Sequence, residues 1–107
     1  MKRLPAGDIN FLQQKAMPYF GISYVKLCWS DSKKQWPDIW CMPSENKIVV
    51  TQEWLKQPVG ERRKRLVHEC LHFLGLEHGR YNGLEYSTYP KEDLHSLKIY
   101  KDIVGGL

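Results

Sequence analysis

The spacing of five residues constrains the fold of this chain more than any other feature of its sequence. These residues are His68, Glu69, His72, Gly75 and His78. His68 and His72 are four residues apart, so a helix places both imidazoles on one face, with Cβ atoms roughly 5–6 Å apart. A helix that continued past Gly75 would carry His78 away from this pair. Glycine adopts a left-handed backbone conformation at little cost and can end a helix in a sharp turn. The spacing therefore predicts a helix, a turn at Gly75 and three imidazoles that converge.

Three converging imidazoles are a typical ligand set for zinc. Zn²⁺ binds histidine nitrogen at about 2.0–2.1 Å, and a site with three protein ligands keeps a fourth position open for water or substrate. We therefore predict one Zn²⁺ per chain, bound by His68, His72 and His78. Glu69 follows His68 directly, and a carboxylate there can take a proton from zinc-bound water and pass it to a leaving group. This pattern indicates a hydrolase with Glu69 as its catalytic base.

Residues 68–79 resemble the metzincin family of zinc peptidases, whose signature is H-E-x-x-H-x-x-G-x-x-H. Residues 74–79 are most similar to the matrixin branch, and a weaker similarity extends over residues 61–105. The resemblance implies a zinc-dependent endopeptidase that acts on peptides or proteins. It also implies that an extended substrate pairs with an edge strand above the metal, for which residues 38–51 are the candidate.

The resemblance points to two tyrosines and exposes one departure from the family. A tyrosine after the third histidine, Tyr86 or Tyr89, is expected to stabilise the developing oxyanion. Metzincins have a methionine in a turn beneath the metal, whereas the equivalent stretch of this chain offers Glu85 or Thr88. His95, the remaining histidine, is assigned no function.

The sequence leaves two other functions open. Endoribonucleases of the YbeY type are similar in their three histidines and intervening glycine, and a net charge of +4 suits a nucleic-acid substrate. Those enzymes have glycine where this chain has Glu69, the base that peptide hydrolysis needs. A zinc-stabilised binding module is the third hypothesis, and it explains neither Glu69 nor the open ligand position. We expect a peptide or protein substrate, and neither nucleic acid nor a membrane as a partner.

Hydrophobic periodicity predicts an α+β fold with a small three-stranded mixed sheet. An N-terminal helix capped by Asp8 is expected to end at Pro18 and Gly21. Three β-rich runs follow it, and turn residues between the second and third predict a hairpin. The expected strands are residues 22–29, 38–42 and 47–51.

Two helices are predicted after the sheet. The helix that carries His68 and His72 is expected over residues 61–74. Residues 76–89 show no clear period and are expected to be irregular. A C-terminal helix is expected to open at Pro90 with Asp93 in its first turn, where the helix dipole favours an acid.

The length of 107 residues fits a single catalytic domain over residues 1–107. Three cysteines, at positions 28, 41 and 70, lack paired spacing and are expected to be reduced and mostly buried. The basic run at residues 62–65 is expected to be a solvated helix face, with steering of an acidic partner as the alternative. No secretory signal and no apolar run of membrane-spanning length is evident, so we expect a cytoplasmic protein.

Overall fold

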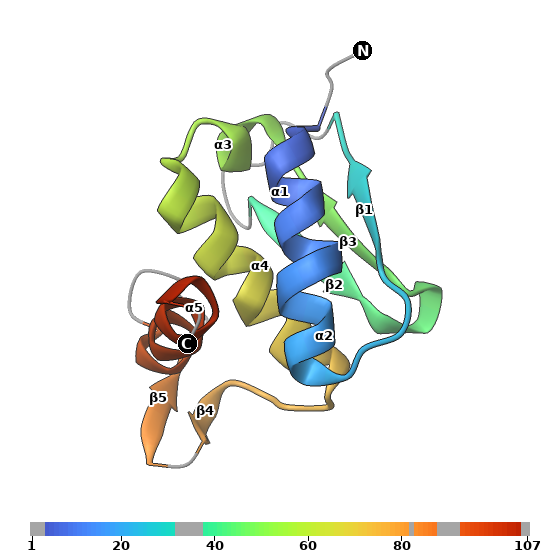
Figure 1. The fold of residues 1–107 in the computed structure, drawn as a ribbon. Helices are drawn as coiled ribbons and strands as arrows, with labels where there is room; N and C mark the ends of the chain where they lie inside the picture. The colour runs from blue at the N-terminus through green and yellow to red at the C-terminus, as the bar shows by residue number, and fades with distance from the viewer. Residues whose placement is uncertain (1–3, 32–37, 82, 88–92, 106–107) are drawn as a thin grey trace.

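In a computed structural model, described over residues 4–31, 38–81, 83–87 and 93–105, the chain packs helices against a small sheet (Figure 1). The N-terminal helical run and the long helix α4 (Val59–Phe73) lie over the same face of this sheet, and α5 (Leu94–Gly105) packs across α4 (Figure 1). The core between them is apolar, and Trp54, Leu66 and Ile48 are fully enclosed. The α+β class is confirmed.

The three-stranded sheet is mixed, as predicted, and its order is β1-β3-β2. Strand β1 (Lys26–Trp29) runs parallel to β3 (Lys47–Val50), and β2 (Ile39–Met42) runs antiparallel to β3 as its hairpin partner. The hairpin turns through the 3₁₀ segment η2 (Pro43–Glu45) and through Asn46, whose φ is +54°. The first strand is shorter than expected and begins at Lys26. Strand β2 lies at one edge of the described sheet.

The N-terminal helical run passes through Pro18 and ends at Gly21, so of the two residues predicted to end it only the glycine does. It consists of α1 (Ala6–Phe11), the π-helical segment η1 (Leu12–Ala16) and α2 (Met17–Phe20), and it stops at Gly21, whose φ is +70°. Proline has no N–H to donate within a helix. The preceding turn is π-helical instead, and the Met17 N–H donates to the Leu12 carbonyl.

Asp8 and the basic run at residues 62–65 form buried ion pairs, so the predicted cap and the predicted solvated face are both wrong. Arg62 and Arg63 donate to the Asp8 carboxylate at 2.7 and 2.9 Å. Arg65 pairs with Asp38 of the segment that leads into β2, and Lys64 pairs with Glu61. Lys64 and Arg65 are each only 4% exposed. The three arginines therefore hold α4 to the N-terminal helix and to the segment before β2, while the Lys64 pair lies within α4.

The chain after α4 contains more regular structure than the sequence predicted. Strands β4 (Gly79–Tyr81) and β5 (Leu84–Tyr86) pair antiparallel within the stretch that was expected to be irregular. Helix α5 begins at Leu94, so Asp93 precedes the helix and does not lie within its first turn. The expected start at Pro90 lies outside the described residues.

Three smaller findings complete the fold. The short helix α3 (Gln52–Leu55) places Trp54 in the core, where its indole N–H donates to the Arg62 carbonyl at 3.2 Å. All three cysteines are free thiols, but only Cys70 is buried, while Cys28 and Cys41 are half-buried. None of the helices within the described ranges has both the length and the apolar character needed to cross a membrane.

Candidate metal centre

Three histidine side chains converge at the C-terminal end of α4. The Nε2 atom of His68 lies 3.3 Å from Nε2 of His72 and 3.3 Å from Nε2 of His78. His68 and His72 stand one helical turn apart on α4, and His78 follows the turn at Gly75, whose φ is +83°. The backbone therefore brings the third imidazole back to the first two in the way that the spacing predicted.

The separation of these nitrogens matches a tetrahedral metal site. Two ligands of a tetrahedral ion at 2.0–2.1 Å from the metal are about 3.3–3.4 Å apart. One nitrogen from each of the three histidines lies within 4.8 Å of the others. Three imidazoles in this arrangement could hold a metal ion. His95 lies on α5 and is not part of this group.

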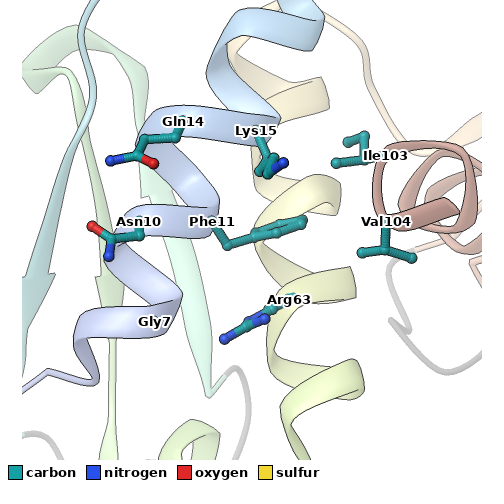
Figure 2. Close-up of a pocket in the computed structure, with 8 residues that line it drawn as sticks. All are labelled: Gly7, Asn10, Phe11, Gln14, Lys15, Arg63, Ile103 and Val104. Carbon is teal, nitrogen blue, oxygen red and sulfur yellow. The ribbon is translucent and has the colours of Figure 1, made fainter. Parts of the chain in front are cut away.

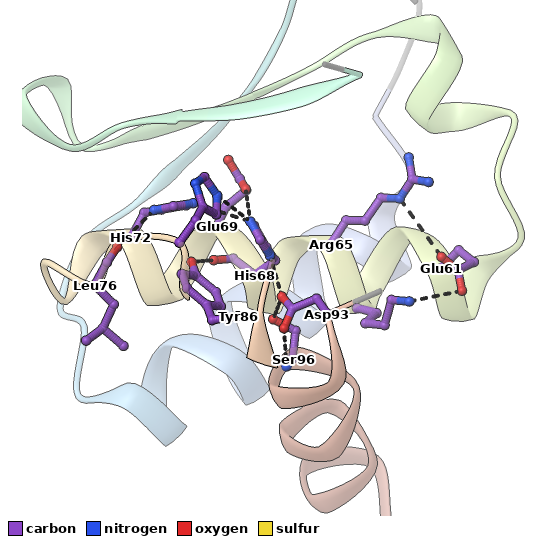
Figure 3. Close-up of polar contacts among 11 residues, drawn as sticks. Glu61, Arg65, His68, Glu69, His72, Leu76, Tyr86, Asp93 and Ser96 are labelled. Atoms are coloured by element: carbon purple, nitrogen blue, oxygen red, sulfur yellow. Dashed lines mark hydrogen bonds and ion pairs between the residues drawn. The ribbon is translucent and has the colours of Figure 1, made fainter. Parts of the chain in front are cut away.

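A buried carboxylate orients the first histidine. The Nδ1–H of His68 donates to the side chain of Asp93, which directs Nε2 toward the other two imidazoles (Figure 3). The same carboxylate accepts the Ser96 backbone N–H at 2.9 Å and the Ser96 hydroxyl, so Asp93 also caps α5. Burial alone would raise the pKa of Asp93, but the hydrogen bonds from His68 and Ser96 hold it below its usual range. Asp93 therefore remains an anion that fixes the His68 tautomer.

The second and third histidines are oriented more weakly. His72 donates from Nδ1 to the Leu76 carbonyl at 3.1 Å, which leaves its Nε2 for the centre (Figure 3). Burial, followed by the proximity of His68 and His78, lowers the pKa of His72 to about 4. His78 is an exposed residue, but partial desolvation of its imidazole, followed by the proximity of His68, lowers its pKa as well. Both imidazoles are therefore neutral near pH 7, as a metal ligand must be.

Glu69 lies between the histidines and the edge strand β2. Its Oε2 atom is 3.7 Å from Nε2 of His68, and the side chain is only 7% exposed. Burial raises the pKa of Glu69 to about 8, against a hydrogen bond from the Cys41 backbone N–H that lowers it. The nearby Asp93 charge raises it further. Glu69 is thus a carboxyl group whose proton affinity is in the range useful for proton transfer near neutral pH.

The aromatic ring of Tyr86 packs against all three imidazoles. The ring centroid lies 4.7, 5.3 and 5.5 Å from those of His68, His72 and His78, and the ring stacks on the first and third. The Tyr86 hydroxyl donates to the His68 carbonyl at 2.7 Å (Figure 3). Burial raises the pKa of this phenol, which stays protonated. This geometry does not favour the oxyanion role predicted for Tyr86, because its hydroxyl is hydrogen-bonded to a main-chain carbonyl of α4.

The other residues singled out at the turn beneath the metal have different positions. Glu85 is exposed on β5 next to Tyr86, so its side chain is not enclosed beneath the imidazoles. Thr88 and Tyr89 lie outside the described residues.

The contact of Asp93 with His68 was not predicted from the sequence. The pattern of Asp93 followed three residues later by Ser96 is a signal for a helix cap, and it contains no information about His68. No protein-family model, no curated protein and no solved structure matches this chain. The function is therefore inferred from the centre itself.

Proposed function

We propose that the protein is a zinc-dependent endopeptidase. The observation that carries the proposal is the pair of 3.3 Å separations among the three Nε2 atoms, with the Glu69 carboxyl beside them. Zinc bound by His68, His72 and His78 would act as a Lewis acid and lower the pKa of a water molecule bound to it. This ligand set leaves a position for that water, which a closed structural site does not.

Glu69 is the residue proposed to move the proton. It is near the histidine nitrogens but is anchored by the Cys41 N–H, which keeps the carboxyl beside the ligands rather than among them. The carboxylate would accept a proton from the attacking water and deliver it to the leaving amine. Asp93 would hold His68 in the tautomer that presents Nε2 throughout the reaction.

The edge strand β2 supports an extended peptide as the substrate. Its partner β3 pairs with only one side of β2, and the Cys41 main chain lies next to Glu69. A peptide that added to the free side of β2 would pass the catalytic carboxyl. An open cavity of about 510 Å³ is lined in part by His78 and Tyr86 and offers room for a substrate side chain.

The buried basic run weakens the endoribonuclease alternative. Nucleic-acid binding relies on accessible Lys and Arg side chains that neutralise phosphates. Four of the cations counted in the net charge, those at positions 62–65, are paired with Asp8, Asp38 and Glu61. The peptide substrate is therefore the better supported proposal.

The test is the substitution Glu69→Gln, which keeps the size of the side chain and removes its basicity. Zinc content should stay near wild type, while hydrolysis of a peptide library should fall by roughly 10²-fold or more. Glu77→Gln is the matched control, because Glu77 precedes His78 but is exposed. Full activity in Glu69→Gln would refute the assignment of the base. RNA cleavage without peptide cleavage by the wild-type protein would refute the peptidase proposal.

A further inference from the structure

A second cavity lies away from the metal centre, between the N-terminal helical run, α4 and α5 (Figure 2). Its volume is about 420 Å³, which is within the range of small-molecule sites, roughly 300–1,000 Å³. The residues that line it come from three elements, and none of them contributes to the metal centre. Nothing in the proposed peptidase activity uses this cavity.

The cavity has an apolar floor. Phe11 and Ile103 are 5% and 9% exposed, and they approach one another from α1 and α5 across α4 (Figure 2). Val104 lies at the rim and is 52% exposed, which is high for a large apolar side chain. A ligand with a short apolar body would cover this valine together with the exposed part of the floor.

Two cations stand at the edge of the floor. The Arg63 guanidinium donates from Nε to the buried Asp8 at 2.9 Å and lies 5.7 Å over the Phe11 ring. That bond uses one of its five N–H donors and fixes the orientation of the group. A side chain at Gly7 would place its Cβ 2.8 Å from Nη2 of Arg63, so glycine allows this placement. Lys15 is exposed and points toward α5 (Figure 2).

The polar residues of the cavity favour an anion. The described lining residues comprise the two cations and the amides of Asn10 and Gln14, and they include no acid. Gln14 and Lys15 belong to the π-helical segment η1. Segments of this type are rare and often occur at functional sites.

We propose that this cavity binds a small carboxylate that carries an apolar body. Lys15 and the outer nitrogens of Arg63 would receive the carboxylate, and Phe11, Ile103 and Val104 would cover the apolar part. This site is independent of zinc and of the peptidase proposal, since it shares no residue with them.

The test is a titration of the zinc-loaded protein with hexanoate, followed by amide NMR shifts, with 1-hexanol as the uncharged probe of similar size. Hexanoate should shift α1, η1 and α5 in a saturable way, and Lys15→Gln should weaken its binding about tenfold, the effect of losing one charge-assisted hydrogen bond. Lys26→Gln, an exposed lysine on β1, should leave the affinity unchanged.

A matched pair at Val104 keeps the test decisive if Lys15→Gln is poorly folded. Val104→Glu and Val104→Lys remove the same apolar side chain from an exposed position and differ in charge. The first should abolish hexanoate binding and the second should retain it. Equal shifts with 1-hexanol, equal affinities in the two Val104 variants, or hexanoate shifts confined to residues 76–86 that vanish on zinc removal would each overturn the proposal.

Discussion

Asp93 shows how one residue can serve two parts of a fold. Its carboxylate caps α5 through Ser96 and at the same time accepts the His68 Nδ1–H. The local sequence predicts only an acid near a helix start, because that effect depends on near neighbours. The partner His68 is 25 residues earlier in the chain, and the contact depends on how α4 and α5 pack.

Asp93→Asn should separate these two roles. Asparagine is as good a helix cap as aspartate, so the metal-free protein should stay folded. It cannot supply the negative charge that fixes the His68 tautomer, so zinc affinity should fall about 10–100-fold. Competition with a chromophoric chelator measures the affinity, and circular dichroism of the metal-free protein tests the fold. An unchanged zinc affinity would show that Asp93 acts only as a cap.

Glu69 predicts a pH dependence of stability in the metal-free protein. Its pKa is about 8 in the folded state, against about 4.3 for an unfolded glutamate. Between these values the folded chain binds the proton and the unfolded chain does not, so the free energy of unfolding should fall as pH rises. The histidines, whose pKa values are lowered, act in the opposite direction only below about pH 6.5.

The window from pH 6.5 to 8 therefore isolates Glu69. Urea unfolding of the metal-free protein should show a decrease in stability across this window, and Glu69→Gln should show a smaller decrease or none. Equal pH dependence in the two proteins would mean that Glu69 ionises normally when the metal is absent.

The elements differ in how well their sequences predict them. Helix α4 was expected over residues 61–74 and is found over Val59–Phe73, because it is long and periodic. Strands β4 and β5 were missed because three residues are too few to show an alternating pattern. Of the two residues expected to end the first helix, Gly21 does so, whereas a π-helical turn accommodates Pro18.

The turn at Gly75 is the element on which the third ligand depends. Gly75→Ala should destabilise the metal-free protein by about 1–2 kcal/mol, the cost of a left-handed conformation for a residue with a Cβ. Nothing lies within 4 Å of the added Cβ, so the cost is backbone strain and not a clash. Zinc affinity should fall too, since the strain is relieved by moving His78.

Two substitutions calibrate this result. Gly75→Asn should cost less than Gly75→Ala, because asparagine tolerates the left-handed region better. Gly105→Ala, in α5 and also without a nearby atom, should not destabilise the protein. Urea unfolding and chelator competition measure both quantities. A Gly75→Ala protein with wild-type stability and zinc affinity would show that the turn is not restrictive.

In the whole molecule, the candidate centre is built from segments that lie far apart in the sequence. The sequence predicted the three histidines because their spacing is local. It did not predict that Arg62, Arg63 and Arg65 would form ion pairs, because their partners Asp8 and Asp38 lie far along the chain. It also did not predict that the Tyr86 ring would lie against all three imidazoles. Long-range packing decides each of these features.

Because the centre joins α4, the segment after Gly75 and, through Asp93, α5, zinc should stabilise the whole fold. A metal ion present at 1,000 times its dissociation constant adds about 4.1 kcal/mol to the free energy of unfolding. Chelation should therefore lower the melting temperature by well over 10 °C in a domain of this size. His72→Ala should show no difference between zinc and chelator, whereas His95→Ala should keep the difference even if its own stability is reduced. Metal analysis should find one zinc per chain in the wild-type protein. A melting temperature unaffected by confirmed zinc removal, or a His95→Ala protein that no longer responds to zinc, would contradict the three-histidine centre.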